Sequence, residues 1–210
     1  MNIVHLDSVD STNNWCRAHA NELPVCVVAA EQTAGRGRYG KSFHSPVGGV
    51  YMSYAFRSAF TPENVQNVTL AVGAIVHQVL QSHCNAELSI KWVNDILMGK
   101  RKIAGILSEY VDRSEDCDEP YIIVGVGVNV LRYDVPTELE GIVGFLSDSN
   151  PSYDCPSGEE QSIQPAALAD ELAAALDSVF GNGDADLNKI LKYIDYYKDK
   201  CYNCEHITEK

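Results

Sequence analysis

Two continuous apolar runs, residues 25–30 and 49–56, are separated by a stretch rich in glycine and cationic residues. Such runs predict buried strands, so the stretch between them must be a loop that the core anchors at both ends. Within it, GRGRYGK combines glycines, which let a backbone approach a ligand closely, with arginines, whose planar donors suit carboxylate or phosphate. We therefore expect this loop to cover an anionic ligand. Taken alone, it is equally consistent with a flexible basic surface loop or an RGG-like RNA tether.

The overall charge narrows the class of ligand. The 210 residues carry a formal net charge of −13, whereas a general nucleic-acid binder needs a basic face to neutralise phosphates. A locally basic loop in an acidic chain therefore indicates a small anionic ligand and no nucleic-acid partner. We find no signal peptide and no run near the roughly 20 apolar residues that span a bilayer. Seven scattered cysteines fit a reducing compartment, so we expect a cytoplasmic protein without membrane association.

The remaining pattern predicts one domain over residues 1–200 and a polar tail over residues 201–210. Further strands are expected at residues 2–6, 88–92, 96–98, 102–111 and 121–130, and the main helices at residues 61–79, 165–180 and from residue 187 onward. A short helix should begin near Ser11 or Thr12, with one of these side chains as its N-cap. Residues 131–162 are predicted to be a loop, in which residues 147–161, rich in Ser, Pro, Asp and Glu, form a surface excursion. Cys201 and Cys204 form one C-x-x-C with His206 nearby, but a second pair is missing, so we predict no metal site.

Two further segments carry chemistry. Lys91, Asn94 and Asp95 lie within five residues at a strand bend, and Lys102 follows across a tight hairpin. If these strands pair, Asp95 and Lys102 can face one cleft. The strand YIIVGVGVNV contains Gly125 and Gly127, and glycine weakens a buried strand unless something approaches closely there. The space that they leave suits either a flat ligand or close packing of a helix.

Three ordered motifs, GRGRYGKSF, KWVNDILMGKRKIAGIL and VGVGVN, resemble the catalytic domain of biotin–protein ligases. The Ser11-Thr12-Asn13 start and Gln32 fit the same pattern. The resemblance implies an α+β fold with a mixed, largely antiparallel sheet and helices on one face, related to class II aminoacyl-tRNA synthetases. It also implies that biotin and MgATP give biotinyl-5′-AMP, whose biotinyl group passes to a lysine of a biotin carboxyl carrier protein. Since family members dimerise, the resemblance also allows for a homodimer.

The resemblance assigns roles to individual residues. Lys102 would contact the reacting carboxyl group and the α-phosphate, with Arg36 and Arg38 on the adenylate and pyrophosphate side. Ser11, Thr12 and Gln32 would hold biotin by hydrogen bonds, and Phe43 would stack on adenine. Asp95 would orient the incoming amine or contact metal. The residues expected in catalysis are Lys102, Arg36, Asp95 and Lys91. Those expected to bind substrates are Ser11, Thr12, Asn13, Gln32, Gly35, Arg36, Gly37, Arg38, Phe43, Lys102, Gly105, Gly125, Gly127 and Asn129.

The chain also departs from the family pattern. Phe43, Lys41 and Val93 stand where the family usually has Trp, Arg and Pro. Compared with the family, we expect no N-terminal winged-helix domain, hence no repressor role, and no C-terminal β-barrel, because only about ten residues follow the last predicted helix. The sequence is then either a minimal ligase or part of a longer chain. Two other functions remain open: a lipoate ligase or octanoyltransferase, which shares the fold, and a non-catalytic module that binds biotin or its adenylate.

Overall fold

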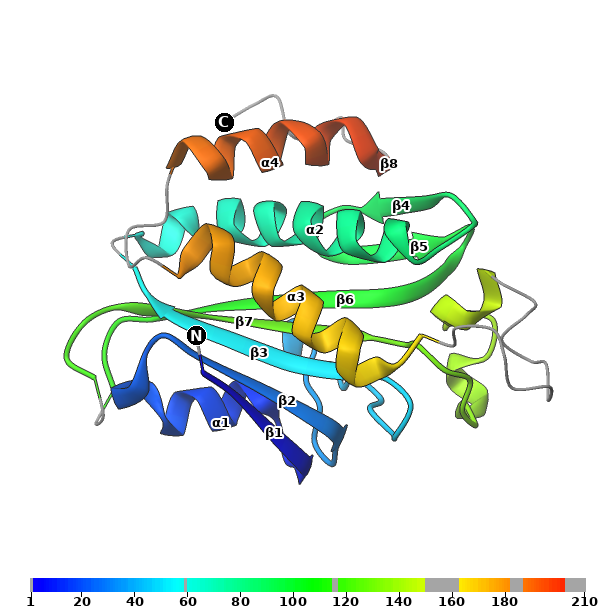
Figure 1. The fold of residues 1–210 in the computed structure, drawn as a ribbon, viewed down its shortest axis with the longest axis horizontal. Coiled ribbons are helices and arrows are strands. Elements are labelled where there is room, and N and C mark those ends of the chain that lie inside the picture. The colour runs from blue at the N-terminus through cyan, green and yellow to red at the C-terminus, as the bar shows by residue number, and fades with distance from the viewer. Residues whose placement is uncertain (1, 59, 115–116, 150–162, 182–186, 203–210) are drawn as a thin grey trace.

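The computed structural model describes residues 2–58, 60–114, 117–149, 163–181 and 187–202. Its centre is an eight-stranded sheet in the order β1-β2-β3-β7-β6-β5-β4-β8 (Figure 1). The strands are β1 (Asn2–Val9), β2 (Val25–Gln32), β3 (Val50–Arg57), β4 (Leu88–Lys91), β5 (Asp95–Met98), β6 (Arg101–Val111), β7 (Tyr121–Val128) and β8 (Cys201–Tyr202). The β1–β2 and β4–β8 pairs are parallel and the other neighbours antiparallel. The predicted mixed, largely antiparallel sheet is confirmed.

The three long helices, α2 (Val65–Ser82), α3 (Pro165–Phe180) and α4 (Leu187–Lys200), lie together on one side of the sheet, with α4 packed outside α2 (Figure 1). The short α1 (Thr12–Ala18) is an exception to the expectation that the helices share one face. Cys26 and Val28 of β2 pack in the core beneath the long helices, whereas Val25 and Val27 pack with Cys16 of α1. Because β1 and β2 are parallel neighbours, their connection must cross over the sheet, and α1 makes that crossover on the opposite face.

Two local predictions need correction. Ser11 occupies the N-cap position of α1 but makes no capping hydrogen bond through its side chain. Instead, the backbone N–H of Thr12 donates to Gln32 Oε1 over 2.9 Å. Cys201 and Tyr202, predicted to begin a tail, add a short parallel strand beside β4. Cys204, His206 and most of the predicted 147–161 excursion lie outside the described residues. Within the described ranges, no helix is long and apolar enough to cross a bilayer.

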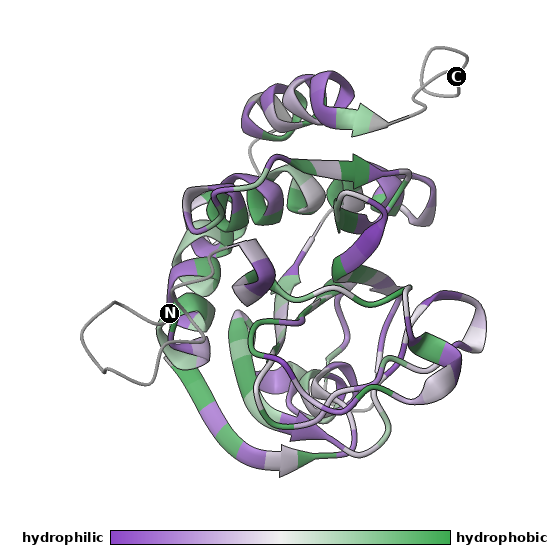
Figure 2. Cartoon of the chain, turned by 90° about the vertical axis from the view of Figure 1, so that its right-hand side faces the viewer, coloured by the Kyte–Doolittle hydropathy of each residue, from purple (hydrophilic) through white to green (hydrophobic). Residues whose placement is uncertain are grey.

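On the face of the sheet that carries α1, three neighbouring positions of β6 and β7 are glycines and have no side chain. Gly125 and Gly127 of β7 and Gly105 of β6 occupy this face, and Gly105 pairs directly with Gly127. Loops from residues 33–49 and 129–149 line this region. The 129–149 segment lies at the right of Figure 1, on the side that Figure 2 turns toward the viewer. The sheet thus provides a rigid floor, and the loops provide walls.

Candidate active site

A cavity of about 450 Å³ lies above the glycines on the α1 face of the sheet, a volume within the range of small-molecule sites. It collects side chains from the start of α1, the 33–49 loop, the β5–β6 hairpin, β7 and the segment after β7. The lining includes these residues predicted to act in the site: Ser11, Thr12, Asn13, Gln32, Arg36, Gly37, Arg38, Phe43, Asp95, Lys102, Gly105, Gly125, Gly127 and Asn129. Two predicted residues, Gly35 and Lys91, lie outside the lining.

Three side chains cover the glycine floor in a row. A Cβ at Gly125 would collide with the Asn13 amide of α1, and one at Gly127 would come within 2.6 Å of the Phe43 ring. A Cβ at Gly105 would lie 2.9 Å from Lys102 Nζ. Packing of α1 therefore explains Gly125, which is one of the two explanations that the sequence allowed, while Gly127 faces the Phe43 side chain of the 33–49 loop.

The cationic end of the cavity centres on Lys102. Its Nζ lies 2.7 Å from Asp95 Oδ1, and each side chain is about a quarter exposed, at 28% and 24%. The antiparallel β5–β6 hairpin creates this pair, as the spacing of the two residues predicted. Arg38 donates to Asn94 Oδ1 over 3.3 Å, which fixes it near the same bend. The cavity lining contains four cationic side chains (Arg36, Arg38, Lys41 and Lys102) and one carboxylate, Asp95. The lining therefore has an excess of about three positive charges, although the chain has a net charge of −13.

The glycine–arginine loop has the hydrogen bonds of a tight hairpin. Gly37 N donates to Lys41 O over 2.7 Å, Arg36 and Ser42 form a bridge, and Phe43 N donates to Gly35 O over 2.9 Å. Gly35 is buried, and a Cβ there would come within 2.6 Å of Ser45 Oγ. Gly35 therefore allows close packing beneath the loop, whereas the exposed Arg36 side chain is presented at the cavity.

The other end of the cavity is polar and uncharged. Gln32 Oε1 accepts hydrogen bonds from the Thr12 N–H over 2.9 Å and from Thr12 Oγ1 over 3.1 Å. Gln32 Nε2 donates to Ser45 Oγ over 3.0 Å. Ser11, Thr12 and Asn13 are all buried, at 2–5% exposure. Hydroxyl and amide groups held this way can match a neutral ligand group that has both donors and acceptors.

The segment after β7 forms a wall of the cavity, a role that the prediction of a loop over residues 131–162 did not include. Lys102 N donates to Ile142 O over 2.8 Å, and Gly144 N donates to Lys102 O over 2.9 Å. The Tyr133 hydroxyl donates to Asn129 Oδ1 over 2.8 Å, and burial raises the pKa of Tyr133 to about 12, so the proton stays in place. The wall thereby holds the backbone of the central lysine. The sequence could not predict this wall, because the segment after β7 is irregular and has no periodic pattern of apolar residues.

Two predicted contacts differ in the structure. Lys91 is exposed on β4 and does not reach the cavity, although it pairs in register with Asp95. Asn129 lines the cavity, but both ends of its amide are engaged, by Tyr133 and by Lys102 O at 3.2 Å. Its observed role is to support the lysine backbone. Within the described ranges, no cluster of three or more metal-ligating side chains occurs.

Residues 6–129 match the model of the biotin/lipoate A/B protein ligase family. The chain is 33% identical over 154 residues to the bifunctional ligase/repressor BirA of Bacillus spizizenii, covering 70% of this chain and 47% of that protein. It is 33% identical over 129 residues to the biotin–[acetyl-CoA-carboxylase] ligase of Mycobacterium tuberculosis, covering 59% and 45%. The chain thus spans about half the length of these curated relatives.

A solved structure gives the same picture of the fold. The biotin protein ligase of Leishmania major in complex with biotinyl-5-AMP superimposes with a TM-score of 0.73 at 23% identity, covering 100% of this chain and 85% of that one. This similarity confirms the class of fold that the motifs implied.

Proposed function

Because this chain belongs to the biotin/lipoate A/B protein ligase family, we propose that it activates biotin with ATP and transfers the biotinyl group to a protein lysine. The observation that carries the proposal is the polarity of the cavity. One end offers neutral donors and acceptors around Thr12, Asn13 and Gln32, and the other gathers cations around Lys102. Biotin has the matching form, a neutral cyclic urea at one end and a carboxylate at the other.

The cationic end suits the first half-reaction. A biotin carboxylate must attack the α-phosphate of ATP, and two unit charges at about 4 Å repel by roughly 4 kcal/mol at an effective dielectric near 20. Lys102, with Arg36 and Arg38, supplies positive charge where the negative charge gathers. The oxygen of the carboxylate forms a bond to the α-phosphorus, and pyrophosphate leaves. Mg²⁺ would arrive with ATP, and Asp95 is the lining carboxylate that can bind it or its water.

The neutral end holds the other end of biotin. Ser11, Thr12 and Gln32 would form hydrogen bonds with the cyclic urea, beside the strand that carries Gly125 and Gly127. Phe43 covers Gly127 in this structure, so binding requires that the ring move and lie against the ligand. The ring then covers the mixed anhydride and limits its hydrolysis.

In the second half-reaction an acceptor lysine attacks the activated carbonyl group and AMP leaves. The partner we propose is a biotin carboxyl carrier protein, since the Mycobacterium tuberculosis relative is named a ligase of biotin to acetyl-CoA carboxylase. Asp95 lies beside Lys102, where its carboxylate can orient the incoming amine. Lys91 can contact the carrier from outside the cavity, since it is exposed near the same hairpin.

The test is ATP–pyrophosphate exchange by this chain with biotin, lipoate or octanoate as the acid. We expect exchange with biotin alone, followed by transfer to a carrier domain. Exchange with lipoate would favour the lipoate branch of the family. Biotin binding without exchange would instead assign the chain as a binding module.

A further inference from the structure

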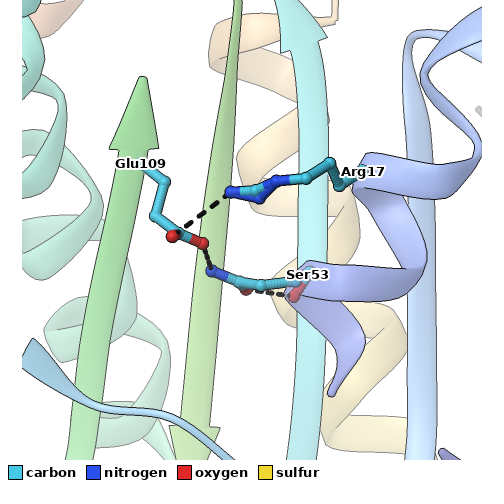
Figure 3. Close-up of polar contacts among 4 residues, drawn as sticks. Arg17, Ser53 and Glu109 are labelled. Atoms are coloured by element: carbon cyan, nitrogen blue, oxygen red, sulfur yellow. Dashed lines mark hydrogen bonds and ion pairs between the residues drawn. The ribbon is translucent and has the colours of Figure 1, made fainter. Parts of the chain in front are cut away.

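Behind the neutral end of the cavity, α1 and β6 are joined by a carboxylate that no sequence motif singled out. Glu109 Oε2 accepts a hydrogen bond from Asn13 Nδ2 over 2.6 Å, and Glu109 Oε1 lies 3.3 Å from an Arg17 guanidinium nitrogen. Figure 3 shows Glu109 extending from β6 toward Arg17 of α1, with Ser53 below. Asn13 lines the cavity and Glu109 does not. Any effect of Glu109 on a ligand must therefore pass through Asn13.

The charge of Glu109 decides which way the Asn13 amide points. A carboxylate can only accept hydrogen bonds, so the atom that faces it must be the NH₂ group of Asn13. The carbonyl oxygen of Asn13 then faces Ser53 Oγ, 2.6 Å away. Ser53 is fully buried and has one proton, which it gives to this oxygen.

The orientation of the Asn13 amide also sets the direction of the hydrogen bonds at Ser53 and Thr12. Ser53 Oγ also lies 2.7 Å from Thr12 Oγ1. Because the Ser53 proton is committed to Asn13, Thr12 keeps its own proton to donate to Ser53 or to Gln32 Oε1. If residue 109 could donate, Asn13 could turn its NH₂ group toward Ser53, and Ser53 could then give its proton to Thr12 Oγ1. The bond from Thr12 to Gln32 would keep its direction, because Gln32 Oε1 can only accept.

The orientation of Asn13 matters to a ligand because its Oδ1 is the atom nearest the space above Gly125, on the cavity floor. A carbonyl oxygen has two lone pairs, so Oδ1 can accept from Ser53 and from one further donor. We propose that Glu109 is a positioning residue that holds the Asn13 carbonyl oxygen toward the cavity as the acceptor for a ring N–H of the cyclic urea of biotin. This inference rests on the proposed function, because it assigns a donor on the biotin ring.

The decisive variant is Glu109→Gln, which keeps the shape of the side chain and can donate as well as accept. We expect the KM and Kd for biotin to rise by up to about tenfold, because the urea N–H of biotin loses one neutral hydrogen bond to Asn13 Oδ1. The KM for ATP and kcat should stay within about twofold of wild type, because Glu109 lies away from the cationic end. The matched control is Glu119→Gln, since Glu119 forms an exposed ion pair with Arg57 at 3.0 Å and lies outside the cavity lining.

A double-mutant cycle separates positioning from a general loosening of the fold. In the Asn13→Ala background, Glu109→Gln should cause no further loss of biotin affinity, because its intermediary is gone. An equal loss in both backgrounds, or parallel rises in KM for biotin and ATP, would overturn the proposal.

The wild-type chain separates this inference from the proposed function. Wild-type exchange with biotin, combined with unchanged biotin affinity in Glu109→Gln, overturns the positioning role alone. A wild-type chain that neither binds biotin nor supports exchange overturns both.

Discussion

Replacing Lys102 by alanine removes the cation at the centre of the cavity, and two losses should follow. The first is a preorganised charge at the transition state, which typically costs about 10²–10³ in rate, or roughly 2.7–4 kcal/mol. The second comes from the partner, because Asp95 Oδ1 lies 2.7 Å from Lys102 Nζ and loses its ion pair. We therefore expect biotin-dependent exchange to fall at least ~10²-fold.

The second loss can be sized from the geometry. An unpaired carboxylate at roughly 5 Å from an incoming anion repels it by about 3 kcal/mol at an effective dielectric near 20, and by about 0.8 kcal/mol in bulk water. Asp95 is 24% exposed, so its repulsion falls between these values. Adding Asp95→Asn to Lys102→Ala should thus restore exchange by at least about fourfold.

The assay is ATP–pyrophosphate exchange at saturating biotin and ATP, with thermal unfolding to verify folding. Lys100→Ala is the matched control, because Lys100 is exposed at the turn of the same hairpin. Near-normal exchange by Lys102→Ala would refute the role of this lysine. A double variant slower than Lys102→Ala would show that the role open to Asp95 in holding Mg²⁺ outweighs its repulsion of the incoming anion.

Three further predictions concern other parts of the molecule. Arg36→Ala should speed release of biotinyl-AMP more than it weakens capture of biotin, since Arg36 belongs to the exposed loop; equal release rates would contradict this. Gly127→Ala should lower biotin affinity at least about tenfold while thermal stability changes little, because the new Cβ would meet the end of the Phe43 side chain, 2.6 Å away, and no backbone atom among its nearest neighbours. Unchanged biotin affinity by calorimetry would argue against Gly127 as part of the cavity floor. Burial lowers the pKa of His77 below 6.5. On acidification the unfolded chain therefore takes up this proton before the folded chain does, and the free energy of unfolding should fall as pH drops through about 6.5. In urea titrations His77→Gln should make the free energy of unfolding less dependent on pH in this range, and an unchanged pH dependence would exclude His77 as its source.

The elements near one another in sequence were well predicted. The apolar runs at residues 25–30 and 49–56 are β2 and β3, and helix α3 spans the predicted residues 165–180. The contact between the Asp95 and Lys102 side chains was also accessible, because the tight turn between β5 and β6 brings the two strands side by side. Such features depend on periodicity and turn chemistry, which a local stretch of sequence contains.

The sequence by itself therefore determined the family, the strands and the cationic loop, because each depends on residue types at short spacing. Tertiary structure alone decided what meets across the cavity. Asn13 and Glu109 are 96 residues apart, and the backbone of Ile142 reaches Lys102 from a segment without periodicity. The tertiary structure also determines that Lys91 lies outside the cavity and that α1 lies on the face of the sheet opposite the long helices. These contacts follow from the order and register of strands that are distant in the chain, where burial and hydrogen bonding of the whole sheet set the arrangement.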